Sequence, residues 1–467
     1  MKVEQIYTGC LAQGAYYIVS NGEAAVIDPL REITPYVERA KRDGVKIKYV
    51  LETHFHADFV SGHVDLAKAT GAKIIFGPTA ATSFDAHIAT DNEVLTLGDV
   101  TLQVLHTPGH TMESTCYLLK DENKKPYAVF TGDTLFIGDV GRPDLAQKAA
   151  HLTQEELAAT LFESLRNKIM TLPDDVIVYP AHGAGSACGK NMSKETVSTI
   201  GDQKKFNYAL RADMSVDDFV KEVTDGLAPP PAYFPMNVAL NKQGVDSIDE
   251  VMKRGLQSLS PADFETASNE TGALMLDTRL AADFCQDFVP NSINIGLNGQ
   301  FAPWVGALIP DVKQELLLIT DAGKEEETIM RLARVGYDHV IGYLEGGIDA
   351  WKAAGKETDK VERISPATFE SIYISQAPYV IDVRKPGEYL TQHVKNAINI
   401  PLDFMNEHLA EFPKDKPFVI HCAGGYRSMI AASILKSRGW NNFMEVEGGY
   451  TAIGKTGVPS ASQEVSF

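Results

Sequence analysis

The chain has 467 residues, of which 44% are hydrophobic and 22% charged, a composition ordinary for a soluble globular protein. Its 43 lysines and arginines against 62 aspartates and glutamates give a formal net charge of −19, which argues against a nucleic-acid partner because phosphates would be repelled. Neither a signal peptide nor a bilayer-spanning apolar run is apparent, so we expect a cytoplasmic protein of about three domains with no membrane partner.

The first predicted elements are two short strands between residues 3 and 29. They are joined at residues 20–23, where Asn-Gly between apolar runs is a hairpin signal. An amphipathic helix is expected over Ile33–Arg42. A buried strand at Tyr49–Leu51 and a helix over residues 63–70 then flank a short polar segment.

That segment, THFHADF at residues 53–59, offers two histidines one residue apart and then a carboxylate. Three later apolar stretches also end at a histidine or an aspartate. Together the four strand ends supply His54, His56, Asp58, His110, Asp133 and His182. Because α/β metal sites are built from several strand ends, these side chains are predicted to share one metal site.

This set of motifs resembles the metallo-β-lactamase superfamily over about the first 245 residues, which implies the αββα fold. Two-metal hydrolases of that superfamily carry a histidine directly after the aspartate, where this chain has Phe59. A phenyl ring cannot bind a metal, so a single metal is expected. Two histidines and one carboxylate with open positions form the facial triad of non-haem Fe(II) oxygen chemistry.

Within the superfamily the chain resembles the persulfide dioxygenases. This resemblance implies one Fe(2+) per chain, held by His54, His110 and Asp133. The residues that would orient ligands or substrate are His56, Asp58 and His182. The motif GDVGRPD at residues 138–144 carries the same resemblance, and its Arg142 is expected either to hold an anionic group near the iron or to form a structural salt bridge.

The remainder of this region is predicted to be largely helical. Thr153 and Glu156 form a capping-box pattern at the start of a helix over Thr153–Lys168. A glycine-rich loop at residues 183–190 resembles the variant found in persulfide dioxygenase–rhodanese fusions. Helical stretches are expected from Lys194 to Arg211, and a domain boundary near Gly244.

The rest of the chain contains an internal repeat of about 100 residues. LDTR at residues 276–279 matches IDVR at 381–384, and EGG at 345–347 matches EGG at 447–449. Both copies alternate short apolar runs with helical stretches, so each is expected to be a small α/β domain with a parallel sheet. The predicted domains span residues 1–245, 256–357 and 360–467.

The second copy contains FVIHCAGGYRS at residues 418–428, a buried strand that ends at Cys422, then a glycine-containing loop and a helix from about residue 428 to 437. Loop N–H groups and a helix N-terminus favour the thiolate, and Arg427 adds a charge for an anionic sulfur donor. This pattern resembles the rhodanese family over about residues 360–460. It implies a Cys422 persulfide, with substrate bound by Gly424, Gly425 and Tyr426.

The first copy has Asp321 where the nucleophile belongs, and Lys324 and Glu325 replace the Tyr-Arg end of the loop. A carboxylate cannot carry a sulfane sulfur, so this copy is interpreted as an inactive rhodanese that serves as a spacer or docking surface.

The five cysteines are odd in number and lack Cys-x-x-Cys pairing, so neither a disulfide framework nor a structural zinc site is expected. Cys10 and Cys285 are interpreted as packed thiols, and Cys188 as a residue near the metal site without an assigned role.

We therefore expect an enzyme that oxidises a low-molecular-weight thiol persulfide with O2 to sulfite and thiol. The last domain would move sulfane sulfur through Cys422 and so make or use thiosulfate. A homo-oligomer is also expected. Two alternatives stay open: a zinc thioester hydrolase of the glyoxalase II type, opposed by Phe59, and a non-catalytic sulfur carrier, which would leave the metal triad idle. The thiol itself is open between glutathione, coenzyme A, bacillithiol and others.

Overall fold

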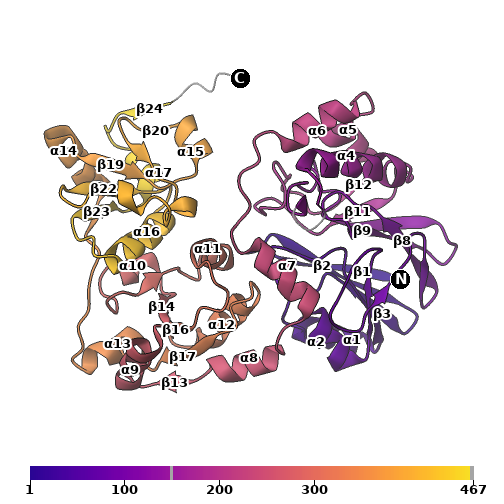
Figure 1. Cartoon of the computed structure of the whole chain (residues 1–467), viewed down its shortest axis with the longest axis horizontal. Coiled ribbons are helices and arrows are strands. Elements are labelled where there is room, and N and C mark those ends of the chain that lie inside the picture. Colours follow the sequence, from indigo (N-terminus) through magenta and orange to yellow (C-terminus); the bar gives the residue numbers. More distant parts are fainter. Residues whose placement is uncertain (148–150, 463–467) are drawn as a thin grey trace. The chain divides into compact units, whose positions relative to one another are not determined.

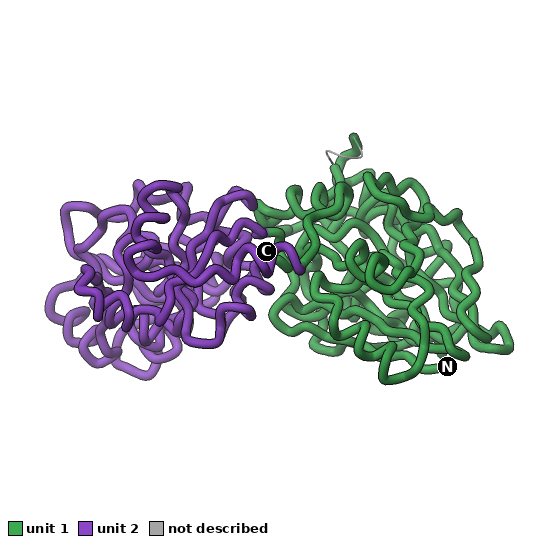
Figure 2. Tube along the Cα trace, turned by 90° about the horizontal axis from the view of Figure 1, so that it is seen from below, with its two compact units in different colours: residues 1–248, 333–336 green, residues 249–332, 337–467 purple. Residues whose placement is uncertain are grey.

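The computed structural model describes residues 1–147 and 151–462 of the chain (Figure 1). Its contacts divide it into two compact units, shown in green and purple in Figure 2. The first contains residues 1–248 with 333–336, and the second contains residues 249–332 with the rest of the chain from 337. The predicted boundaries of the three domains stay predictions, and residues 463–467 of the last one lie outside the described residues.

Two six-stranded sheets form the centre of the first unit. The first runs in chain order through β1 (Lys2–Thr8), β2 (Gln13–Ser20), β3 (Glu23–Ile27), β4 (Lys46–Leu51), β5 (Lys73–Phe76) and β6 (His87–Ile88). The second also follows chain order, through β7 (Val94–Leu97), β8 (Val100–His106), β9 (Thr115–Lys120), β10 (Pro126–Gly132), β11 (Ile177–Pro180) and β12 (Ser198–Thr199). Apolar side chains of both sheets, such as Ile18 and Phe130, share one buried cluster, so the sheets pack face to face.

Helices cover the outer faces of both sheets. α1 (Thr34–Asp43) and α2 (His63–Thr70) pack Tyr36 and Leu66 against the first sheet. α4 (Gln154–Ser164) and α6 (Val216–Thr224) pack Leu161 and Phe219 against the second. Figure 1 shows these layers, and the predicted αββα fold is confirmed.

Three local predictions need correction. Residues 3–29 hold three strands rather than two, because β1 also pairs with β2 through a turn at residues 8–13. The helix predicted to reach Lys168 ends as an α-helix at Ser164 and continues as a π-helix over Leu165–Ile169, whereas its Thr153–Glu156 capping box is present. The stretch from 194 begins with β12, which pairs with β11, before α5 (Ile200–Phe206) and the 3₁₀ turn Tyr208–Leu210.

The second unit contains two five-stranded parallel sheets with the same strand order. One is ordered β13 (Ser258–Leu259), β17 (Val340–Leu344), β16 (Leu316–Ile319), β14 (Leu274–Asp277), β15 (Ile293–Asn294). The other is ordered β18 (Arg363–Ile364), β23 (Phe443–Val446), β22 (Phe418–His421), β19 (Tyr379–Asp382), β21 (Ile398–Asn399). The predicted pair of parallel-sheet α/β domains is confirmed.

The helices of this unit follow the same repeat. The first sheet is accompanied by α9 (Pro261–Thr271), α10 (Ala281–Phe284), α11 (Phe301–Leu308), α12 (Glu325–Ala333) and α13 (Gly347–Ala353). The second is accompanied by α14 (Pro366–Gln376), α15 (Pro386–Thr391), α16 (Tyr426–Ser437) and α17 (Gly449–Ile453), with a small ribbon of β20 (His393–Val394) and β24 (Ser460–Ala461). Single 3₁₀ turns lie at Leu402–Phe404 and Leu409–Glu411.

Two further helices, α7 (Phe234–Gln243) and α8 (Ile248–Gly255), lie in the chain between the first unit's sheets and β13. Of the helices formed by the described residues, none combines the length and apolar character that crossing a bilayer requires.

Candidate metal centre and sulfur-transfer site

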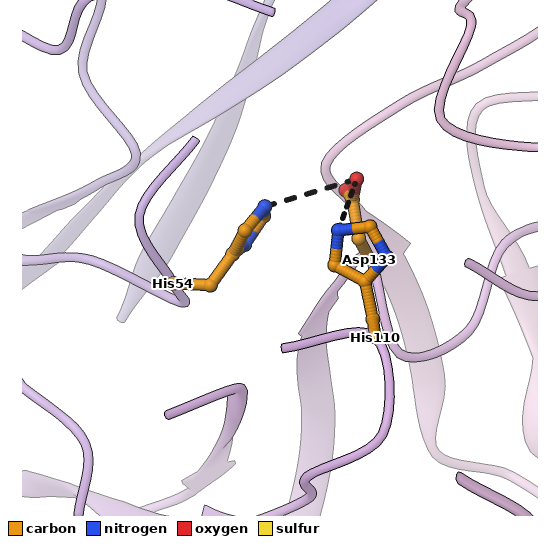
Figure 3. Close-up of side chains that lie close together, drawn as sticks. All are labelled: His54, His110 and Asp133. Atoms are coloured by element: carbon orange, nitrogen blue, oxygen red, sulfur yellow. Dashed lines mark ion pairs between the residues drawn. The ribbon is translucent and has the colours of Figure 1, made fainter. Parts of the chain in front are cut away.

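Three buried side chains from separate strand ends converge in the first unit (Figure 3). His54 follows β4, His110 follows β8, and Asp133 follows β10. Asp133 Oδ2 lies 3.8 Å from His54 Nε2 and 3.5 Å from His110 Nε2. The predicted triad is therefore brought together, with one atom of each residue facing a common point.

The other polar atoms of the triad are already engaged. His54 Nδ1 lies 3.0 Å from the Thr53 hydroxyl, and His110 Nδ1 donates to the Arg142 carbonyl over 2.9 Å. Asp133 Oδ1 accepts a 2.9 Å hydrogen bond from His182 Nδ1, while Asp133 Oδ2 has no hydrogen-bond partner among the described residues. Two free imidazole nitrogens beside an unpartnered buried carboxylate oxygen fit a divalent cation.

The protonation states also suit a metal. Burial lowers the pKa of His54 well below its usual value, and the charge of His56 lowers it further, so its imidazole is neutral. Burial raises the pKa of Asp133, but the charge of His182 and the hydrogen bond from its imidazole outweigh burial and hold that pKa low. A neutral imidazole and an ionised carboxylate are the forms that bind metals.

His56 faces a different set of partners. Its Nε2 lies 3.2 Å from Asp28 Oδ1 and 3.3 Å from Glu52 Oε2, and its ring stacks on Phe59 with 4.2 Å between centroids. Asp28 also accepts the Thr53 N–H over 2.7 Å, next to His54. His56 thus belongs to a buried ion cluster that supports the loop carrying His54.

Sequence reasoning missed Asp28 and Glu52, although both stand at the end of an apolar strand, which was the available signal. Burial raises the pKa of Asp28, against the charge of His56. For His56 burial lowers the pKa, but Asp28 and Glu52 raise it to about 10, so we interpret the group as an ion cluster.

Asp58 and His182 lie together beside the triad. His182 Nε2 is 2.9 Å from Asp58 Oδ2, so its imidazole links Asp58 to Asp133. Cys188, from the glycine-rich loop, offers its sulfur within the same small group and is buried. These contacts suit the predicted orienting role of Asp58 and His182, and they place Cys188 near the triad as expected.

Arg142 is engaged in structural contacts. Its guanidinium binds Asp144 through two hydrogen bonds of 2.6 and 2.7 Å and also donates to the carbonyls of Ala187 and Ala228. Only 5% of its side chain is exposed. Since these partners leave little of the guanidinium for a ligand, the salt-bridge alternative is favoured over substrate binding.

Cys422 lies at the end of β22 and is 1% exposed. Its sulfur accepts the Gly425 N–H over 3.1 Å, at the start of α16. Arg427 is held by Glu388 through hydrogen bonds of 2.6 and 2.8 Å, and the Tyr426 hydroxyl donates to the Gly296 carbonyl over 2.7 Å. A cavity of about 350 Å³ opens here, lined by Gln300, Trp304, Lys385, Glu388, Cys422, Gly424, Tyr426 and Arg427.

The cavity therefore gathers the predicted sulfur-transfer residues Cys422, Gly424, Tyr426 and Arg427. Sequence reasoning missed Glu388, whose position three residues after Lys385 carried no distinctive signal. It also missed Gln300 and Trp304, which come from the first copy, where Asp321 stands at the nucleophile position.

The corresponding loop of the first copy differs in exposure as well as in chemistry. Residues 321–324 are all exposed, and the Lys324 ammonium pairs with Glu327 at 2.8 Å. All five cysteines of the chain are free thiols. Cys285 is buried and Cys10 is half-buried, and their interpretation as packed thiols stays a prediction.

The chain also matches known families. Residues 8–182 match the metallo-beta-lactamase superfamily, and residues 260–354 and 365–456 each match the rhodanese-like domain. A crystal structure of a metallo-beta-lactamase from Staphylococcus aureus subsp. aureus COL is 30% identical, with a TM-score of 0.64. It covers 74% of this chain and 98% of that one, so the likeness extends beyond the first unit.

Two groups of curated relatives match the first part of the chain. The mitochondrial persulfide dioxygenase ETHE1 of Homo sapiens is 31% identical over 221 residues, which cover 47% of this chain and 78% of the relative. A hydroxyacylglutathione hydrolase of Polaromonas sp. is 32% identical over 240 residues, which cover 45% and 86%. The chain belongs to the metallo-β-lactamase superfamily, with a persulfide-dioxygenase-like domain followed by two rhodanese-like domains.

Proposed function

We propose that this protein is a persulfide dioxygenase coupled to a thiosulfate sulfurtransferase. The observation that carries the proposal is the buried convergence of His54, His110 and Asp133, with Phe59 at the position that supplies a further ligand in two-metal hydrolases. The similarity to persulfide dioxygenases over the same region supports it.

In this proposal one ferrous ion is held by His54, His110 and Asp133, and when bound it supplies the activation of O2. His182 fixes the Asp133 carboxylate through Nδ1, and the Arg142 carbonyl fixes the tautomer of His110. The buried cluster around His56 holds the His54 loop in place. These contacts keep the three donor atoms preorganised and shielded from water.

The last domain is proposed to transfer sulfane sulfur through Cys422. In the forward direction the outer sulfur of a Cys422 persulfide bonds to sulfite, the bond to the Cys422 sulfur breaks, and its electron pair returns to that sulfur as thiolate. Sulfite and thiol are the products proposed for the first domain, and two sites on one chain raise the local concentration of the shared intermediate. Persulfide and O2 would thus give thiosulfate.

The test is O2 consumption by the purified full chain across a panel of thiol persulfides, with metal analysis of the same sample. We expect one iron per chain and O2 uptake, both removed by His110→Ala. Two tightly bound zinc ions per chain, in protein made with iron supplied, would overturn the proposal.

The alternative is a zinc-dependent thioester hydrolase of the glyoxalase II type, supported by the similarity to hydroxyacylglutathione hydrolases. It needs a second metal position, for which Asp58 and His182 are available but position 59 offers only a phenyl ring. Hydrolysis of S-lactoylglutathione without O2 uptake would favour this alternative.

A further inference from the structure

Three polar side chains that are not among the residues lining the cavity, Ser428, Glu445 and Arg363, form a hydrogen-bonded relay that begins at the Cys422 sulfur. The Ser428 hydroxyl lies 3.3 Å from Cys422 Sγ and 2.6 Å from Glu445 Oε1. The other oxygen of Glu445 accepts from Arg363 Nε over 2.7 Å. Ser428 and Glu445 are fully buried, so most of this relay is shielded from water.

The hydroxyl of Ser428 has a single proton to share between these two neighbours. The carboxylate is the stronger acceptor and lies 0.7 Å closer than the sulfur, since the two distances are 2.6 and 3.3 Å. The Ser428 proton therefore points to Glu445, and a Ser428 lone pair faces Cys422. In this arrangement Ser428 can accept the thiol proton, but it stabilises a thiolate only after its own proton has moved to Glu445.

The sheet register holds these groups in place. Glu445 on β23 is paired with Ile420 of β22, two residues before Cys422, and with Arg363 of β18 on its other side. Ser428 lies in the first turn of α16. The groups that converge thus come from β18, β23, the end of β22 and the start of α16.

Several other ionisable groups surround the relay of Ser428, Glu445 and Arg363. Glu447, at the end of β23, and Cys285, in the segment after α10, interact electrostatically with both Arg363 and Glu445. Arg427, on α16, faces Cys422 but is held by Glu388 of α15. His421, on β22, is buried, and its ring faces Asp382 at 4.0 Å. None of these groups touches the Ser428 hydroxyl among the contacts of the described residues.

The first copy, which has Asp321 at the nucleophile position, provides an internal comparison. The strand register that pairs Arg363 with Glu445 pairs Ser258 with Tyr343 there. Counting from Asp321, the position equivalent to Ser428 is occupied by Glu327. The same count places Glu325 and Glu326 at the Tyr-Arg end of the loop, one residue later than predicted, in agreement with the helix starts at Glu325 and Tyr426. The first copy, which lacks the cysteine nucleophile, therefore also lacks all three residues of the relay.

Other buried polar groups are kept in both copies. Asp277 binds Arg279 as Asp382 binds Arg384, each through a 2.6 Å contact. These pairs serve the shared fold. In contrast, the relay of Ser428, Glu445 and Arg363 occurs only in the copy that has the cysteine at the nucleophile position.

We propose that Glu445 is a positioning residue that takes up the Cys422 proton through Ser428 during sulfur transfer. As the Cys422 sulfur attacks the outer sulfur of a donor, a new S–S bond forms and the S–S bond of the donor breaks, with its electron pair leaving on sulfite or a thiolate. The thiol proton passes to Ser428 Oγ while the Ser428 proton passes to Glu445. The proton returns by the same route when Cys422 is released as a thiol.

The environment of Glu445 suits a proton acceptor. Burial raises the pKa of its carboxyl above the ordinary value, and the charge of Arg363 only partly offsets this. A buried carboxylate with a raised pKa is a stronger base than one in water. The inference rests on the proposed role of Cys422 as nucleophile.

The test is the pH dependence of Cys422 alkylation by iodoacetamide in the full-length protein, measured on the Cys422 peptide by mass spectrometry. We expect Glu445→Gln to move the rising limb of the profile up by about one pH unit, which is roughly a tenfold slower reaction near neutral pH. The amide of glutamine still accepts from Ser428 but cannot take its proton. Ser428→Ala should give a shift of the same direction, and the double variant should add nothing further.

Glu447→Gln is the matched control, because this exposed glutamate acts on Glu445 only through its charge and has no hydrogen bond to Ser428. It removes a nearby carboxylate without removing the proton acceptor, so it should move the profile much less than Glu445→Gln does. The role is overturned if Glu445→Gln and Ser428→Ala leave the midpoint unchanged or lower the rate equally at every pH, as a merely structural effect would. Ser428→Ala removes no charge, so it decides the question if Glu445→Gln does not fold.

Alkylation needs no sulfur donor. If the unmodified protein transfers no sulfur at all, the proposed function fails, while the alkylation profiles still test the relay. If sulfur transfer depends on Cys422 but the profiles do not move, only the relay fails.

Discussion

The two rhodanese-like domains share one strand order and one buried Asp–Arg pair but differ at the end of the central strand. In one, Cys422 is buried between a glycine loop and a helix start. In the other, Asp321 lies in an exposed loop whose Lys324 pairs along the surface with Glu327. The fold is therefore maintained by groups that are separate from those that perform the proposed chemistry.

The difference extends beyond the nucleophile. The first copy lacks the serine, glutamate and arginine of the relay, yet it contributes Gln300 and Trp304 to the cavity in front of Cys422. A domain with an aspartate at the nucleophile position thus still forms part of the wall of the cavity in front of Cys422.

The largest expected effect comes from Cys422→Ser. We expect thiosulfate:cyanide sulfurtransferase activity to fall by about a thousandfold or more, because the copy with Asp321 has no nucleophile to compensate. With a persulfide and O2, uptake of O2 should largely persist while sulfite accumulates in place of thiosulfate. Thiocyanate formation by this variant, or an unchanged sulfite-to-thiosulfate ratio, would contradict the assignment.

The shared ion pairs should matter equally in both domains. Asp277→Asn and Asp382→Asn each leave a buried arginine without its charged partner, and breaking such a pair destabilises by about 3–5 kcal/mol. Hydrogen exchange read separately for each domain measures the effect. Loss of protection in only one of the two matched variants would show that the copies do not depend on this pair alike.

A smaller effect is expected at Glu388, which neutralises Arg427 in the Cys422 cavity. The hydrogen bond from Arg427 holds the pKa of Glu388 below its usual value, with burial opposing, so the carboxylate is charged near neutral pH. Glu388→Gln should free the guanidinium for anions and lower the KM for thiosulfate by roughly fivefold, about 1 kcal/mol. The KM for thiosulfate, measured at low ionic strength with Glu447→Gln as the control variant, checks this. A raised KM would contradict it.

For the last variant we expect no change in sulfurtransferase activity. Asp321→Cys in a Cys422→Ser background should not restore sulfur transfer, because the loop after Asp321 does not rebuild the anion cradle and the groups equivalent to Ser428 and Glu445 are missing. Thiocyanate formation by the double variant would show that the loop alone is sufficient.

Much of the fold was predictable because it depends on local patterns. The apolar runs at 49–51, 100–105 and 176–179 all lie within or overlap strands, and the Thr153–Glu156 box caps its helix. The internal repeat predicted two parallel-sheet domains, which share a single strand order. The strand between Lys2 and Thr8 was missed because it lies at the edge of its sheet and is only half-buried.

The sequence by itself determined which residue types stand at the strand ends: His54, His110, Asp133 and Cys422. Only the tertiary structure decided what surrounds them. Asp28 and Glu52, more than 20 residues apart, meet at His56, and Arg142 is bound by partners as distant as Ala228. Arg363, Ser428 and Glu445 come together across 82 residues through sheet register. Strand ends can be read from local hydrophobicity, whereas contacts between buried polar groups depend on which strands become neighbours.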